Sequence, residues 1–288
     1  MVMNKTIKQT GCSVLIIIIV IIGVYFYSLL NAFFDIATGP SGRSIKNFEK
    51  TPVYEFALAI DDDDVDRLKY LLENKPPDLD INYISRPWKI TLMGWALINN
   101  KQNSLECLLK YGANPFLHKQ GRTTDECTFI MAIERCRIDV LNSIFRFSSI
   151  DSIPPMVAGS ALTYAYSNCP EALTLLFENK VHEADKDGYS VYVSIIQGHW
   201  NFALELMRMG VPFNNFIKMS EPYTTDDPVL DKTICYYIYN NRTAIRDVDE
   251  VTRDRLIKYL KINKGINVFD RKNLENPRNY NTTDFYNP

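Results

Sequence analysis

The sequence lacks the short motifs that mark common enzyme sites. It has no GxSxG nucleophile elbow, no P-loop, no GxGxxG turn and no HExxH metal pair. Histidine is scarce, with three residues in a chain of 288, and none lies beside a nucleophile motif. CxxC pairs and Cys/His pairs at zinc-ligand spacing are absent as well. These absences argue against an enzyme and against a bound metal or cofactor.

The chain also lacks a strong excess of charge of either sign. Lys and Arg number 32 against 34 Asp and Glu, a net charge of −2, so no general attraction to nucleic acid is expected. The six cysteines are Cys12, Cys107, Cys127, Cys136, Cys169 and Cys235. Scattered in this way they fit small core residues, and a structural role is favoured over redox chemistry for Cys127 and Cys136. One disulfide could form among them in an oxidising compartment.

One long apolar run is present near the start of the chain. Residues 13–34 read SVLIIIIVIIGVYFYSLLNAFF, which is 22 residues without a charge. A helix of this length spans roughly 30 Å, the thickness of the hydrocarbon core of a bilayer. The alternative is a cleaved signal peptide, but the run exceeds the usual apolar core of about 7–15 residues. We therefore predict a short tail, residues 1–12, followed by an uncleaved transmembrane signal anchor.

Charge alone does not fix the orientation of this anchor. Lys5 and Lys8 precede the span, whereas Arg43, Lys46 and Lys50 follow it, so the positive-inside rule does not decide. A very short N-terminal tail without acidic residues favours a cytoplasmic N-terminus. That orientation places the rest of the chain on the outer face of the membrane, which is the periplasm if the source is a Gram-negative bacterium.

Internal repetition is the main feature after residue 50. A short apolar helix, a polar turn and a second helix recur five times, and a sixth copy follows an insertion within residues 212–232 and 240–252. The matched apolar positions of the second helices are Leu71, Leu108, Ile144, Leu176, Leu206 and Tyr259. Their first four spacings, of 37, 36, 32 and 30 residues, bracket a period of about 33. The pattern predicts an all-α stack of helix pairs.

Each short first helix has a small residue at the same place, which closely packed neighbouring backbones require. These residues are Ala59, Ala96, Ala132, Ala165 and Ser194. With LECLLKYGAN at 105–114, ADKDG at 184–188 and Gly198-His199, the pattern resembles the ankyrin-repeat family over about residues 50–270. The segment TLMGWA at 91–96 is a degraded form of the family signature TPLHxA.

The resemblance implies an ankyrin-repeat solenoid of five to six degenerate repeats over residues 51–270. A flexible linker at 35–50 would precede it, and a C-terminal cap or tail at 271–288 would follow. The sequence departs from the family at the turn between the two helices, where Asp63, Asn100 and Cys136 replace the usual glycine. A solenoid of another helical-hairpin type is the alternative.

In the ankyrin-repeat family, partners bind to the finger tips between repeats and to the short-helix face. The resemblance implies a protein-binding surface at Tyr83, Arg86, Trp88, Lys89, Trp95, His118 and Arg122. Trp, Tyr and Arg are the residue types that dominate binding hot spots. The alternative is that Trp88 and Trp95 pack the finger onto the stack. The run Asp61–Asp64 indicates a solvated cap, since a calcium loop spaces its ligands at alternate positions.

An anchor, a linker and a binding solenoid without a catalytic constellation resemble a known kind of bacterial immunity protein. Such proteins protect bacteria against their own type VI secretion phospholipase effectors. The resemblance implies a single-pass inner-membrane protein, with its repeats in the periplasm, that binds and neutralises a cognate toxin where the toxin acts. The alternatives are a membrane scaffold for an endogenous or host partner and, with least support, an enzyme with an unrecognised site.

Overall fold

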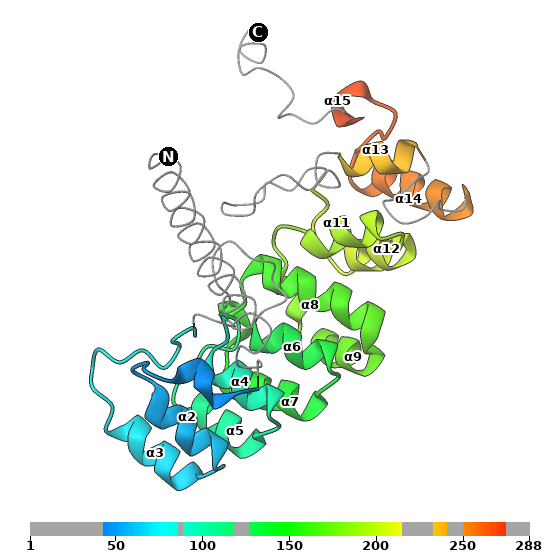
Figure 1. Ribbon diagram of the computed structural model, residues 1–288. Helices are drawn as coiled ribbons and strands as arrows, with labels where there is room; N and C mark the ends of the chain where they lie inside the picture. Colours follow the sequence, from blue (N-terminus) through cyan, green and yellow to red (C-terminus); the bar gives the residue numbers. More distant parts are fainter. Residues whose placement is uncertain (1–42, 86–88, 118–126, 215–232, 241–249, 275–288) are drawn as a thin grey trace, which may run out of the picture. The chain divides into compact units, whose positions relative to one another are not determined.

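The computed structural model describes residues 43–85, 89–117, 127–214, 233–240 and 250–274 (Figure 1). The described part of the chain is all-helical, and it contains no strand, so the predicted all-α class is confirmed there. None of its helices is long and apolar enough to span a membrane. The predicted anchor at 13–34 lies outside the described residues.

The chain divides into two compact units, residues 1–46 and residues 47–288. A short 3-10 helix, η1 (Ile45–Phe48), lies at the boundary. The second unit therefore begins at Asn47, within the segment 35–50 that the sequence predicts as a flexible linker. The physical reason is Phe48, which is fully buried and packs edge-on against the ring of Trp95.

Most helices of the second unit form pairs, which we number as repeats 1 to 6. In order they are α2 (Tyr54–Asp61) with α3 (Val65–Glu73), α4 (Leu92–Ile98) with α5 (Gln102–Lys110), α6 (Thr128–Glu134) with α7 (Ile138–Phe147), α8 (Pro155–Asn168) with α9 (Pro170–Glu178), α11 (Tyr189–Ile196) with α12 (Trp200–Arg208), and α13 (Ile234–Tyr239) with α14 (Glu250–Asn263). The short elements are η3 (Ile150–Ser152), α10 (Val181–Ala184) and α15 (Arg271–Leu274).

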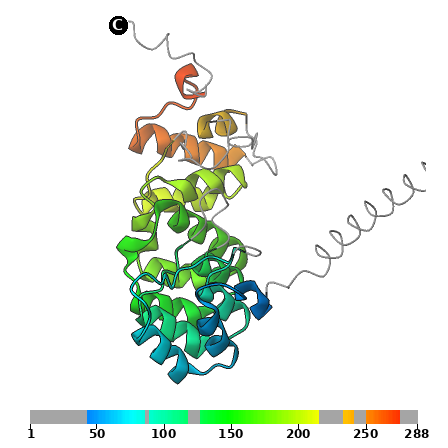
Figure 2. The ribbon, with the colours of Figure 1, turned by 60° about the vertical axis from the view of Figure 1, so that its left-hand side comes forward.

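The pairs follow one another in chain order, as Figure 2 shows by its colours from blue to orange. The first helices α2, α4, α6, α8, α11 and α13 each contact the next in that order. The second helices form another layer, in which α3, α5, α7 and α9 contact in turn and α12 contacts α14. All five small residues predicted on the first helices are fully buried, as close helix packing requires.

One turn geometry joins the two helices in four of the pairs. Asp63, Asn100, Cys136 and Gly198 have left-handed backbones, with φ of 54°, 58°, 51° and 84°. The next residue then donates its N–H to the carbonyl of the small residue five positions back, at 2.7–2.9 Å. This is the Schellman ending of a helix, which favours glycine but tolerates Asn and Asp. The residues that stand in place of glycine therefore keep the same turn.

The second helices bury the apolar positions that the sequence matched, with two exceptions. Leu108, Ile144, Leu176 and Leu206 are fully buried, whereas Leu71 in the first pair is half-buried. In α14 the fully buried residues are Leu256 and Leu260. The match at Tyr259 is thus displaced by one residue, and its hydroxyl instead donates to the carbonyl of Met207 at 3.0 Å.

Candidate functional site

Three of the seven predicted binding residues fall within the described part of the chain. Tyr83 and Lys89 are half-buried in the connection between repeats 1 and 2. The other four, Arg86, Trp88, His118 and Arg122, lie outside the described residues. Of the predicted surface, the structure therefore places the base of one finger.

Trp95 is not part of a binding surface. Its side chain is fully buried in α4, and its ring meets that of Phe48 at a centroid distance of 5.6 Å and an angle of 71°. A partner cannot reach a side chain without exposed area, so the predicted binding role of Trp95 is corrected to packing. The sequence also allows a packing role for Trp95, and its burial against Phe48 supports that role.

Hydrogen bonds fix the base of the finger between repeats 1 and 2. Ser85 donates its N–H to the carbonyl of Ile90 at 2.9 Å, and Ile90 donates its N–H to the Ser85 hydroxyl at 3.2 Å. The side-chain oxygen of Asn82 accepts the N–H of Asn114 at 2.8 Å, which ties this finger to the next repeat. Lys89 has a left-handed backbone with φ of 52°. The described residues on both sides of this finger are thus held by backbone and side-chain hydrogen bonds.

A second candidate surface lies in the other helix layer, between α3 and α5. A groove of about 620 Å³ opens there, within the range of small binding pockets. It is lined by Val65, Lys69, Asn103, Glu106, Cys107, Lys110 and Tyr111. The sequence analysis missed it because two repeats build it together, and no single segment carries its pattern.

The ionisable groups of this groove are already held by neighbours. The Tyr111 hydroxyl donates to Glu73 at 2.6 Å, which raises the pKa of Tyr111 to about 12. The Ser143 hydroxyl donates to Glu106 at 2.7 Å and lowers the pKa of that carboxyl. Burial raises the pKa of the Cys107 thiol, which keeps it protonated and a poor nucleophile. The groove thus presents two lysines, Lys69 and Lys110, beside a carboxyl and a phenol that are already hydrogen-bonded.

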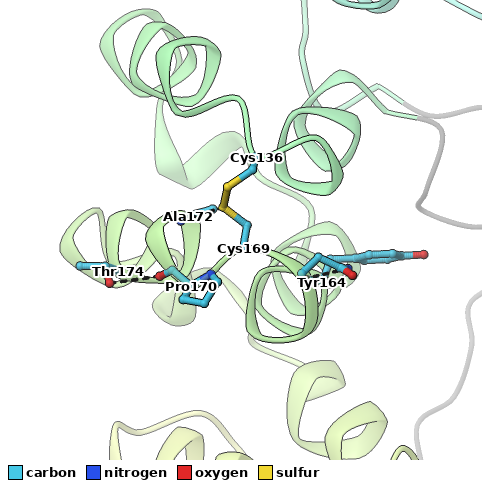
Figure 3. The surroundings of a disulfide bond; sticks show 7 residues. Cys136, Tyr164, Cys169, Pro170, Ala172 and Thr174 are labelled. Carbon is cyan, nitrogen blue, oxygen red and sulfur yellow. Dashed lines mark hydrogen bonds between the residues drawn. A yellow bond between two sulfur atoms is a disulfide. The ribbon is translucent and has the colours of Figure 1, made fainter.

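A disulfide joins two turns of adjacent repeats (Figure 3). Cys136, in the turn after α6, pairs with Cys169 at the junction of α8 and α9, with 5.6 Å between their Cα atoms. The two residues are 33 positions apart, which is one repeat period. Cys136 is exposed and Cys169 is 1% exposed. The structural role predicted for Cys136 takes the form of this cross-link, whereas Cys127 is buried and is not part of a disulfide.

Polar contacts tie the preceding turns together in the same way. The Lys101 ammonium donates to the Asp61 carbonyl at 2.7 Å, and the Ser104 hydroxyl donates to Asp63 at 3.0 Å. One step further, the Arg137 guanidinium donates to the side chain of Asn100 at 2.8 Å. Repeats 1 to 4 are therefore linked along one edge, which we call the turn edge.

The acidic run in the first turn has a structural explanation. Asp64 caps α3 by accepting the N–H of Arg67 at 2.9 Å, and Asp63 supplies the left-handed residue of the turn. Asp62 lies 4.0 Å from the Arg67 guanidinium. Within the described ranges, no group of His, Cys, Asp or Glu residues could hold a metal ion.

Comparison of the chain with known protein families, curated proteins and solved structures finds no match. The class defined by the described residues is an all-helical protein built from stacked helix pairs. Two surfaces on it suit a partner, the finger at Tyr83 and Lys89 and the groove between α3 and α5.

Proposed function

We propose that this chain is an ankyrin-repeat protein that binds and neutralises a secreted toxin of the phospholipase class. The observation that carries the ankyrin assignment is the recurring turn. Asp63, Asn100, Cys136 and Gly198 take the same backbone conformation at the position where the family has glycine. Each is followed by the same hydrogen bond to a buried small residue. A repeated geometry of this kind supports one repeat family more strongly than helical content does.

A role in binding rather than catalysis is supported by the sequence, which holds no enzyme motif. A stack of repeats offers a long surface built from several connections, which suits a protein partner. The proposed contact surface is the finger side around Tyr83 and Lys89, continued by Arg86, Trp88, His118 and Arg122. Tyr83, Arg86, Trp88 and Arg122 are of the residue types that are frequent in binding hot spots.

The disulfide supports a place outside the cytoplasm for the repeats. Disulfides persist in the periplasm and in secreted proteins, whereas cytosolic thiols are kept reduced. The bond between Cys136 and Cys169 favours an N-terminus inside and repeats outside, which charge alone leaves open. We therefore propose a single-pass protein of the bacterial inner membrane, anchored by residues 13–34.

A tethered inhibitor fits a toxin that attacks phospholipids. The anchor would hold the binding domain at the bilayer, and this raises its effective concentration where the toxin must act. This part of the proposal rests on architecture and on the analogy with type VI secretion immunity proteins. It makes a prediction that co-expression can test.

The test first searches the genes beside this chain's gene for a phospholipase, and then directs that phospholipase to the periplasm of a Gram-negative host. Co-production of the full chain should restore growth, and the two proteins should co-purify from detergent. Absence of protection together with absence of a complex would falsify the immunity proposal.

Two variants then locate the surface within this assay. Tyr83→Ala combined with Lys89→Ala should weaken the complex by tenfold or more, about 1.4 kcal/mol or above, as expected for hot-spot residues. The matched control is Tyr70→Ala, since Tyr70 is 65% exposed but lies on α3 in the other helix layer. If Lys69→Ala and Lys110→Ala weaken binding while the finger variant does not, the groove is the contact surface.

A further inference from the structure

Exposed apolar side chains gather in the last helix pair and the segment after it. Val251 and Ile262 of α14 are 61% and 68% exposed, and Phe269 is 55% exposed. Tyr239, at the end of α13, is 47% exposed, and its ring meets Phe269 at a centroid distance of 6.2 Å. Exposed apolar side chains of this size are candidates for a binding surface, and on α14 they are Val251 and Ile262.

The same region carries a local excess of positive charge. Residues 250–274 hold seven Lys and Arg against three Asp and Glu, which gives +4 in a chain whose net charge is −2. Arg255, Lys258 and Lys261 are exposed on α14. None of these three belongs to the ion pairs found among the described residues. Their charges are therefore available to an anionic partner.

Helix geometry places these two kinds of side chain on one face. Val251, Arg255, Lys258 and Ile262 follow one another at spacings of four, three and four residues, which align along one side of a helix. The buried residues of α14 are Thr252, Leu256 and Leu260. They line another side, with which α14 packs on α12. The exposed face thus carries two cations, Arg255 and Lys258, between two aliphatic side chains, Val251 and Ile262.

We propose that this face of α14, formed by Val251, Arg255, Lys258 and Ile262, docks on an anionic phospholipid bilayer. Aliphatic side chains of an interfacial helix enter the boundary between headgroups and acyl chains. Lys and Arg extend their stems along that boundary and place their charges among the phosphates. Near an anionic surface each cation contributes about fivefold to binding, or about 1 kcal/mol. The proposal goes beyond toxin binding and uses the proposed anchor only to bring a bilayer within reach.

A second copy of the chain is the main alternative occupant, because the first repeat is acidic. Residues 47–85 hold ten Asp and Glu against four Lys and Arg, a net charge of −6. Several of those carboxylates are engaged within their own repeat and its neighbour, with Asp64 capping α3 and Asp63 bound to Ser104. A carboxylate surface also leaves Val251 and Ile262 without an apolar partner. A lipid bilayer satisfies both the charge and the apolar area.

Lysine acetylation in nanodiscs tests the proposal with the full chain. One set of discs contains phosphatidylcholine alone, and the other contains about one third phosphatidylglycerol, the anionic probe. Acetylation of Lys258 and Lys261 should slow by about threefold or more in the anionic discs, and about 0.5 M salt should reverse the effect. Lys69, whose side chain is 57% exposed on α3, is the internal control and should react equally in both. Equal rates at Lys258 in the two lipids would overturn the proposal.

Paired variants separate lipid contact from other causes of protection. Lys258→Glu with Ile262→Glu should abolish the lipid-dependent difference at Lys261, while Lys69→Glu with Tyr70→Glu on α3 should preserve it. All four positions are exposed, so helical content by circular dichroism should stay unchanged. Protection that rises with the number of chains per disc in both lipids would assign the face to a second copy and overturn the proposal. Neither result depends on the toxin, so failure here leaves the proposed immunity function standing.

Discussion

Removing the disulfide between Cys136 and Cys169 should uncouple the two halves of the stack. The bond closes a loop of 33 residues between repeats 3 and 4. In the chain-entropy account a loop of this length restricts the unfolded state by about 12 cal/mol/K, or about 4 kcal/mol at 25 °C. Measured values for such cross-links are commonly about 2–4 kcal/mol. With a urea slope of about 3 kcal/mol/M, the unfolding midpoint should fall by about 1 M.

Cys136→Ser with Cys169→Ser is the appropriate variant. The Cys169 sulfur accepts the N–H of Ala172 at 3.4 Å, and a serine oxygen can take over this capping role at the start of α9. Serine at position 136 meets the same left-handed backbone as cysteine, so the backbone strain is retained. The change therefore isolates the cross-link. The wild-type chain under reducing conditions should behave like the variant.

Two tryptophans lie on either side of the bond and report the halves separately. Trp95 is buried in repeat 2, and Trp200 is buried in repeat 5. In a background with Trp88→Phe, single-tryptophan forms of the full chain in detergent can be unfolded in urea. With the disulfide intact, both should report one midpoint. Without it the two midpoints should separate, because stacked repeats are coupled only through their neighbours.

Two results would refute this reasoning. Thiol titration of the denatured chain should find two more reactive thiols after reduction than before, and equal counts would show that the bond does not form. If the bond forms but its loss leaves both midpoints unchanged, then packing between α6 and α8 alone couples the repeats. The cross-link would then contribute less than about 1 kcal/mol, below the range expected for its loop.

Other parts of the stack give further predictions. Gly159→Ala should destabilise the chain by about 1–3 kcal/mol in urea unfolding, because an added Cβ would lie 2.8 Å from the backbone nitrogen of Ser190. Trp95→Ala should cost about 3–5 kcal/mol, yet leave the toxin affinity of the folded chain unchanged by calorimetry, because Trp95 is a core residue. Lys180→Gly should raise the free energy of unfolding, measured in urea, by about 0.5–1 kcal/mol. Lys180 has a left-handed backbone with φ of 58°, and the substitution removes only an exposed ion pair. Burial raises the pKa of Asp185 in the folded chain above its usual 3.8. The folded state therefore binds the proton more tightly than the unfolded state, and this contribution to stability is lost as pH rises through the folded pKa. The Tm of Asp185→Asn should therefore rise relative to the Tm of wild type as pH increases from about 4. A Tm difference that stays constant with pH would contradict this.

Much of the fold could be predicted because short segments of sequence determine each helix pair, and the same pattern recurs along the chain. Apolar spacing located the helix pairs, and the small residues at Ala59, Ala96 and Ala132 marked where neighbouring first helices approach closely. The replaced glycines were visible in the sequence, but their left-handed backbones were not. Asn and Asp adopt that conformation readily, so the substitution alone did not show whether the turn was kept.

Features that depend on contacts between repeats were not predicted. The groove between α3 and α5 needs two helices from different repeats, and their separation cannot be read from either segment. The pairing of Cys136 with Cys169 had a usable signal, since both lie at an inter-helix turn and are one repeat period apart. The residue type of Trp95 suits binding, so the sequence alone predicts a surface role for it. Only the burial of Phe48 beside it shows which way its ring points.

The turn edge bears on how well the opposite edge could bind. The helices of a pair fold back on each other, so inter-helix turns lie at one end of the repeats and finger connections at the other. Lys101, Ser104 and Arg137 tie the first three turns with hydrogen bonds, and the disulfide at Cys136 ties the third to the fourth. A surface shared by several repeats binds tightly only if the repeats do not have to be ordered on binding. If the proposed partner binds near Tyr83 and Lys89, cross-links at the turns would favour its affinity without occupying the contact surface.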